Sequence, residues 1–261
     1  MRVSVVSDVH GNADALARAG DGVDAVIVLG DLLDFVDYHD HGGGILGAVF
    51  GPDKVARFAE LRRGKQGAVA AYARTLWASL DNAAEVIEEA IRDQYTKLFG
   101  ALTARTYATP GNVDAPALWP DYASEGVHIL DGESAEIGGL RFGFVGGGLL
   151  PAGATLRRTG VWVPNLRSEA DFAARAATLG EIDVLCSHIP PPVAELTYDV
   201  VARRFEIGSA TLAQVIREQR PRWSLFGHVH QPLARRMRIG RTECVNVGHF
   251  QRTEVPYLLK W

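Results

Sequence analysis

The sequence predicts an α/β fold with parallel strands. The chain opens with a β-branched run over residues 3–7, continues with a helical segment over 12–19, and returns to an apolar run over 25–29. Strand, helix and strand in this order imply a crossover and therefore parallel pairing. Short apolar runs ending in glycine or a polar residue recur in the second half. With 261 residues, 47% of them hydrophobic, the chain is long enough for one large domain or two small ones.

The later elements follow from the same patterns. Short apolar runs predict strands over 105–108, 127–130, 140–145, 182–186, 223–226, 244–247 and 257–259. Two helix starts are marked by typical capping residues, one by Ser168 with Asp171 and the other by Ser209. Apolar residues at helical spacing follow each start. We therefore expect helices over 168–179 and from 209 to at least 216.

The segment between the second and third expected strands is different in character. Residues 36–50 are glycine-rich and predict an irregular stretch. Three helices are expected after it, the first capped by Asp53, the second over 69–80, and the third opened by a capping box of Asn82 and Glu85. The third helix carries a broad apolar stripe that favours packing against a core. Residues 36–104 thus form an expected helical insertion in one domain over 1–261.

Composition excludes several functional classes. The net charge of −4 and the pI of about 6.1 argue against general nucleic-acid binding. Cys186 and Cys244 lie in apolar runs and are interpreted as buried small residues, which fits a reducing cytoplasm. The first residues turn polar too quickly for a signal peptide, and no apolar run is long enough for a membrane span. We therefore expect a soluble cytoplasmic protein.

Polar residues follow five of the expected strands, at the point where each strand ends. The carboxyl ends of strands in an open α/β sheet converge on one crevice, so these side chains are expected to meet there. The five segments are Asp8-Val9-His10, Gly30-Asp31-Leu32-Leu33-Asp34, Gly111-Asn112-Val113-Asp114, Ser187-His188 and Gly227-His228-Val229-His230.

This set of residue types indicates a metal site. Carboxylate and imidazole together suit zinc, iron or manganese better than calcium. The pairs Asp8 with His10 and His228 with His230 are spaced i, i+2, which points both side chains the same way if the backbone is extended. A glycine before Asp31, Asn112 and His228 permits a sharp turn or a close approach of the backbone.

The ordered motifs closely resemble those of the calcineurin-like metallophosphoesterase family, over residues 3 to about 250. The resemblance implies a four-layer α/β/β/α sandwich with two mixed sheets. It also implies two divalent metal ions (Mn²⁺, Fe²⁺/Fe³⁺ or Zn²⁺) with Asp31 bridging them. The implied ligands of one ion are Asp8, His10, Asp31 and His230, and those of the other are Asp31, Asn112, His188 and His228.

Two such ions could clamp both oxygens of an in-line phosphoryl displacement. They would also lower the pKa of a bridging water, so that hydroxide is the nucleophile and no side-chain nucleophile is needed. The sequence agrees, since it contains no convincing Ser/His/Asp or Cys/His arrangement and no phosphate loop of the Gly-x-x-x-x-Gly-Lys-Ser/Thr type.

Val113 departs from the family pattern. Many members of the family carry histidine there, to hold the phosphate or protonate the leaving group, and valine does neither. Three consequences stay open: substrates with good leaving groups such as certain phosphodiesters, replacement by His39 or His41, or weak or lost catalysis. A solvated loop is the other interpretation of those two histidines.

Further roles are assigned to residues near the motifs. Asp34 and Asp114 are candidates for orienting a ligand or a catalytic side chain, and a loop cap is the alternative for Asp34. Asn12 and Asn112 are candidate substrate-binding residues, although Asn12 is also a helix cap. The others considered are His128 and His249, interpreted as structural, and Arg157 and Arg158, which are either phosphate contacts or solvated.

The function favoured by the sequence is therefore hydrolysis of phosphoesters. The first hypothesis is a phosphodiesterase acting on small or nucleotide-like substrates, because all seven implied ligands are present. A non-catalytic binding module on the same fold is the second hypothesis, and it is kept open by Val113. A phosphomonoesterase, including a protein phosphatase, is the third. No membrane partner is expected.

Overall fold

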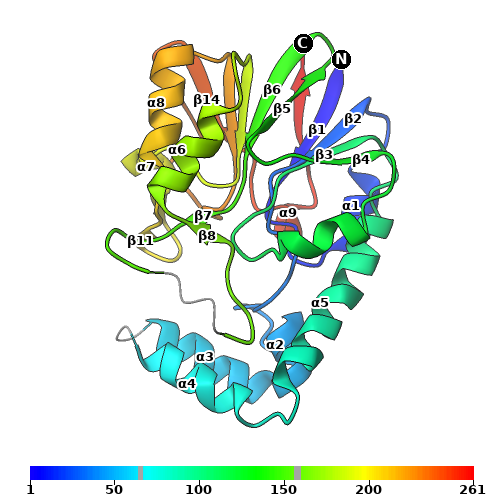
Figure 1. The fold of residues 1–261 in the computed structure, drawn as a ribbon, viewed down its shortest axis with the longest axis vertical. Helices are drawn as coiled ribbons and strands as arrows, with labels where there is room; N and C mark the ends of the chain where they lie inside the picture. Colours follow the sequence, from blue (N-terminus) through cyan, green and yellow to red (C-terminus); the bar gives the residue numbers. More distant parts are fainter. Residues whose placement is uncertain (64–66, 156–159) are drawn as a thin grey trace.

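The computed structural model describes residues 1–63, 67–155 and 160–261, and two mixed sheets form its centre (Figure 1). The first sheet has the strand order β15-β1-β2-β3-β4. Its strands are Tyr257–Lys260, Arg2–Val6, Ala25–Val28, Thr106–Ala108 and Val127–Ile129 in that order. The edge strand β15 is antiparallel to β1, and the other three pairings are parallel, as the opening strand, helix and strand predicted.

The second sheet has the strand order β13-β14-β12-β9-β6-β5. Its strands are Arg236–Ile239, Thr242–Asn246, Trp223–Phe226, Val184–Ser187, Leu140–Val145 and Glu133–Ile137. The two outer pairings are antiparallel and the three inner ones are parallel. Two small sheets pair β7 (Gly148–Leu149) with β8 (Leu166–Arg167) and β10 (Tyr198–Asp199) with β11 (Arg204–Phe205).

Helices cover the outer face of each sheet, which confirms the four-layer α/β/β/α sandwich. One apolar cluster lies between the sheets and includes Val5 of β1 and Phe144 of β6. A second cluster joins β2 to the helices beside the first sheet, and a third packs Phe172 and Leu212 on the second sheet. The helices are α1 (Ala13–Arg18), α6 (Glu169–Ala177), α7 (Ala194–Thr197), α8 (Ala210–Gln219), α9 (Phe250–Thr253) and the 3₁₀ helix η1 (Pro116–Asp121).

Four helices lie between β2 and β3 in the chain: α2 (Gly44–Phe50), α3 (Pro52–Arg63), α4 (Ala68–Trp77) and α5 (Ala83–Gly100). Figure 1 shows α3 and α4 set apart from the sheets, at the far end of α5. The prediction of an irregular stretch over 36–50 is wrong for α2. Its apolar side chains Ile45 and Leu46 are buried, and this packing outweighs the low helix propensity of glycine. The boundaries of the insertion, about 36–104, stay a prediction.

The helix starts test the expected caps. Ser168 forms the full capping box with Asp171, and the Ser209 side chain accepts a hydrogen bond from the Leu212 amide, as predicted. The expected box at Asn82 is wrong, because this side chain makes no capping hydrogen bond. Asp53 is not a cap either, since α3 begins one residue earlier and places Asp53 in its first turn.

The two-residue strands of the small sheets were not expected from the sequence, and neither were two strands of the second large sheet, β5 and β13. Both are edge strands paired on one side, and both carry charged residues, so the apolar alternation that marks a strand is weak. Both cysteines are buried and unpaired, as interpreted. Within the described ranges, no helix is both long and apolar enough to span a bilayer.

Candidate metal centre

The loops that leave β1, β2, β3, β9 and β12 converge at the carboxyl ends of these strands, as the sequence predicted. Two triads of side chains there offer potential ligand atoms within 4.8 Å of one another, and Asp31 belongs to both. The triads are Asp8, His10 and Asp31, and Asp31, His188 and His228. The two remaining candidates, Asn112 and His230, contact His188 and Asp8 respectively.

At one end of the centre, three ligand atoms form a compact triangle. Nε2 of His230 lies 3.3 Å from Oδ1 of Asp8 and 3.3 Å from Nε2 of His10, and the third side measures 3.9 Å. Metal–nitrogen bonds of about 2.0–2.1 Å place neighbouring ligand atoms roughly 3 Å apart. Oδ1 of Asp8 is buried without a hydrogen-bond partner among the described residues. A buried carboxylate oxygen in that state fits a metal ligand.

At the other end, His188 is completely buried. Its Nε2 lies 3.4 Å from Oδ2 of Asp31 and 3.0 Å from Oδ1 of Asn112. The His228 ring stands edge-on to His188 at a centroid distance of 5.1 Å. A carboxylate, an amide oxygen and two imidazoles therefore meet here, which is a donor set that suits a borderline divalent ion.

Backbone carbonyls orient one imidazole at each end. Nδ1 of His10 lies 3.0 Å from the Leu33 carbonyl, and Nδ1 of His188 lies 2.8 Å from the Leu29 carbonyl. Because a carbonyl only accepts hydrogen bonds, Nδ1 carries the proton and the Nε2 lone pair of a neutral ring faces the centre. Metal-binding histidines in proteins are commonly fixed in this way.

The charged side chains of the centre shift one another's pKa values. Burial alone would raise the pKa of Asp8, but the adjacent His230 holds that pKa well below its usual value. Burial likewise opposes the charge on His188, yet Asp31 and Asp8 raise its pKa to about 9. The pKa of His228 falls to about 4 because of burial and the charge on His188. Asp8 and Asp31 are therefore ionised, and each faces a histidine that lowers its pKa.

The backbone in the ligand loops is left-handed, not extended. Asp8, His10, Asp31 and His228 have φ values of +57°, +40°, +52° and +66°. The expectation that extended backbone aligns the i, i+2 pairs is therefore wrong, and tight turns bring these side chains together instead. Such φ values are uncommon for residues other than glycine and cluster at functional sites.

Close backbone approach explains the glycines before the ligands. A Cβ at Gly111 would lie 2.1 Å from Oδ1 of Asp31, and one at Gly227 would lie 2.4 Å from Oδ2 of Asp8. Both distances are far below van der Waals contact, so only glycine fits where each carboxylate packs on the neighbouring loop.

Asp114 joins two of the ligand loops. Its carboxylate accepts backbone hydrogen bonds from Gly111, Asp31, Leu32 and Leu33, at 2.7–3.2 Å. Burial and the nearby Asp31 raise its pKa to about 7 although these amides oppose the shift. The structure therefore brings Asp114 to the backbone of the loops that carry Asp31 and Asn112.

Val113 contributes its backbone amide to the centre, and its side chain is partly buried. Its amide donates to Oδ1 of Asp31 at 2.9 Å, while the side chain packs against the apolar cluster beside the first sheet. No titratable side chain thus extends from position 113.

Asn12 and Asp34 lie beside the ligand loops. The Asn12 side chain caps α1 by accepting from the Ala15 amide, and its amide group donates to the Gln251 carbonyl, which supports the cap interpretation. The Asp34 carboxylate makes no hydrogen bond to a candidate ligand within the described part of the chain. Burial, with Asp37 and Asp40 nearby, raises its pKa to about 7.

His39 and His41 belong to none of the candidate ligand groups of the described residues. Nε2 of His39 lies 3.3 Å from a guanidinium nitrogen of Arg252, and Nε2 of His41 is buried without a hydrogen-bond partner among those residues. Their role in place of a histidine at 113 stays a prediction. Arg157 and Arg158 lie outside the described residues.

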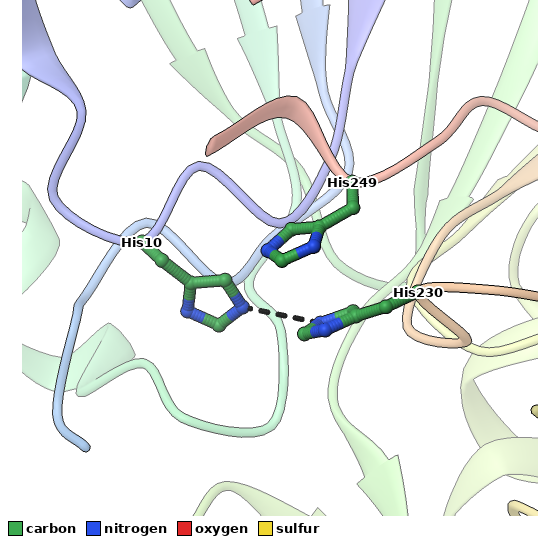
Figure 2. A group of neighbouring side chains, drawn as sticks. All are labelled: His10, His230 and His249. Atoms are coloured by element: carbon green, nitrogen blue, oxygen red, sulfur yellow. Dashed lines mark hydrogen bonds between the residues drawn. The ribbon is translucent and has the colours of Figure 1, made fainter. Parts of the chain in front are cut away.

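His249 was interpreted as structural and without a partner in the motifs, and its position contradicts the second part of this interpretation. Its ring stacks on His230 with centroids 3.8 Å apart and stands edge-on to His10 at 5.6 Å (Figure 2). A signal for it existed, because Gly248-His249 follows the strand β14 as Gly227-His228 follows β12. His128, by contrast, stacks on Tyr107 away from the ligand groups, as expected.

Comparison with known proteins adds a family and a fold. The family model for calcineurin-like phosphoesterases matches residues 1–232. One solved crystal structure aligns at 18% identity and a TM-score of 0.58, covering 96% of this chain and 91% of its own. The crystal structure of TT1561 from Thermus thermophilus aligns at 16% identity and a TM-score of 0.55, covering 99% and 98%. At these identities the two structures show the fold alone. A search of curated proteins gives no significant match.

Proposed function

The chain belongs to the calcineurin-like phosphoesterase family, and from this premise we propose that it is a dinuclear metal-dependent phosphoester hydrolase. In finer detail, we propose a cytoplasmic phosphodiesterase that acts on small or nucleotide-like substrates and uses Mn²⁺, iron or Zn²⁺. One observation carries the proposal: two groups of potential metal ligands share Asp31 at the carboxyl ends of the strands.

The donor atoms divide between the two ends of the centre. Asp8, His10 and His230 would hold one ion, and Asn112, His188 and His228 would hold the other, with Asp31 common to both. Two divalent ions in such a centre supply Lewis acidity toward the phosphoryl oxygens and the means of ionising water near neutral pH.

The residues of the chain prepare the centre for this chemistry. The Leu33 and Leu29 carbonyls fix His10 and His188 with Nε2 facing inward. Asp114 holds the backbone of the Asp31 loop against the Gly111 loop, and Val113 donates its amide to Asp31. The ligands are thus oriented before any ion binds, which avoids the cost of ordering them later.

The preference for diesters rests on Val113. An apolar side chain at this position offers no proton to a leaving oxygen, and general acid catalysis is typically a 10²–10⁴-fold effect. The hydrolysis rate of substrates with good leaving groups falls less when this general acid is absent. The same residue favours the second candidate, a binding module without turnover, whereas the complete set of seven ligands favours the enzyme.

Hydrolysis of aryl phosphodiester and phosphomonoester substrates tests the proposal. Purified protein is treated with chelator and assayed with and without added Mn²⁺, while bound metal is measured in parallel. We expect Mn²⁺-dependent turnover with the diester faster than the monoester. Asp14→Asn, an exposed change on α1, is the control that should leave turnover unchanged. Protein without metal and without turnover would contradict the enzyme and favour the binding module.

A further inference from the structure

We propose that His249 is a further nitrogen ligand of the ion held by His10 and His230. The inference rests on the proposed metal centre and extends it by a residue outside the match to the family model, which ends at residue 232. It predicts that one end of the centre contains three imidazoles, from the loops after β1, β12 and β14.

The first observation is a buried nitrogen without a partner. His249 is 4% exposed, and its Nε2 has no hydrogen-bond partner among the described residues. Leaving a buried polar atom unsatisfied destabilises the folded protein. A ligand that the nitrogen can bind would remove this cost, and the neighbouring groups identify what kind of ligand fits.

The second observation is where the ring lies. One ring nitrogen from each of His10, His230 and His249 falls within 4.8 Å of the other two. Figure 2 shows the His230 and His249 rings face to face, with the edge of His10 directed at His230. Nε2 of His230 also lies 3.3 Å from the unpartnered Oδ1 of Asp8. His249 thus belongs to a cluster of three imidazoles, two of which, His10 and His230, lie within 3.9 Å of that carboxylate oxygen.

The third observation is that hydrogen bonds on both sides of His249 fix its position in the fold. Asn246 donates to the Gly227 and Val229 carbonyls, which ties the His249 loop to the loop of His230. On the other side of His249, the amides of Phe250 and Gln251 donate to the carbonyls of Ser7 and Asp8. His249 is therefore clamped between the two loops that carry the other ligands of the same ion.

Gly248 permits this path of the chain, because its φ of +103° is open to glycine and rarely to other residues.

A third imidazole changes which metal ions this end of the centre prefers. Nitrogen-rich sites suit zinc, cobalt and nickel, whereas sites of carboxylate and water suit manganese and magnesium. The His10 end is therefore expected to favour Zn²⁺ or Co²⁺ over Mn²⁺.

Titration of chelator-treated protein with Co²⁺, followed by the visible absorption of the bound ion, tests the inference. His249→Ala removes the ring, and His249→Phe keeps a stacking ring without a nitrogen. Both should weaken one of two Co²⁺ sites by about 100-fold, at the upper end of the 10–100-fold seen for residues that only support ligands. Both should also change the Co²⁺ spectrum. His128→Ala and His128→Phe, which alter a stacked histidine away from the centre, are the matched controls.

Each alternative gives a distinct result. If His249→Phe keeps wild-type affinity and spectrum, the ring only supports His230 and the inference is wrong. If wild-type protein binds no Co²⁺, the metal centre and the proposed function fail together with it. NMR of Co²⁺-loaded wild-type protein needs no variant to fold. A metal-shifted ring N–H signal is expected from each bound imidazole of His10, His188, His228, His230 and His249, and a signal missing for His249 alone overturns the inference.

Discussion

The two ends of the metal centre are built differently. At the Asp31–His188 end both side chains are buried, with 4% and 0% exposure, and the backbone holds them through the Val113 amide and the Leu29 carbonyl. At the His10–His230 end the side chains are 14% and 35% exposed. His230 is held there by the Asp8 carboxylate at 3.3 Å and by ring contacts, including the stack with His249.

Because of this difference, removing a side chain should affect the stability of the fold differently at the two ends. A buried ion pair contributes to the fold itself, since removing one partner leaves the other charged and desolvated. A partly exposed histidine can be removed at less cost because water replaces it. We therefore expect removal of His188 to lower the free energy of unfolding more than removal of His230, while both changes weaken metal binding.

Asp31→Asn should have the largest effect, because Asp31 is the residue common to both ends. Loss of the shared carboxylate should weaken both ions and lower turnover by about 10³-fold, which corresponds to roughly 4 kcal/mol of lost charge stabilisation. Metal analysis and diester hydrolysis at saturating Mn²⁺ measure it. Near-normal turnover would remove the bridging role.

His188→Ala and His230→Ala compare the two ends directly. His188→Ala should lower the free energy of unfolding by about 3 kcal/mol, because Asp31 is left buried without its partner. His230→Ala should cost clearly less. Denaturant unfolding is measured in chelator, so that lost metal binding does not contribute. Equal losses for the two variants would contradict the difference between the ends.

Asp114→Ala tests how the buried end is held together. Four backbone amides lose their acceptor, so we expect a loss of about 2 kcal/mol or more in unfolding free energy. Asp121→Ala, which breaks an exposed pair with Arg92, is the control and should change little. A loss no larger than that of the control would mean that water satisfies the four amides.

Val113→His should have the smallest effect on the centre and shift its substrate preference toward monoesters. An imidazole at this position can assist a poor leaving group, so the ratio of monoester to diester turnover should rise, by roughly tenfold. Rates on both substrates at equal Mn²⁺ measure it. An unchanged ratio would mean that Val113 does not determine the preference.

The proximity of the seven candidate ligands could be predicted from the sequence because they follow predictable strands. Buried parallel strands are apolar throughout, and the polar residue that ends each one is conspicuous. The local geometry could not be predicted in this way. Asp8, His10 and His228 adopt left-handed backbone, which their residue types do not reveal and tertiary contacts impose.

The features that the sequence analysis missed have one physical cause, because long-range packing determines each of them. Helix α2 forms in a glycine-rich segment because its apolar residues find a core, and edge strand β13 forms by pairing with β14. His249 was missed although its strand end carries the same Gly-His pair as β12, because no motif marks it and only the fold brings it to His230.

Anomalous diffraction from crystals of the protein grown or soaked with Mn²⁺ tests the shared Asp31 most directly. A dinuclear centre should give two anomalous peaks on either side of Asp31, one beside Asp8, His10 and His230 and the other beside Asn112, His188 and His228. A single peak, or peaks away from Asp31, would contradict a dinuclear centre with a shared carboxylate.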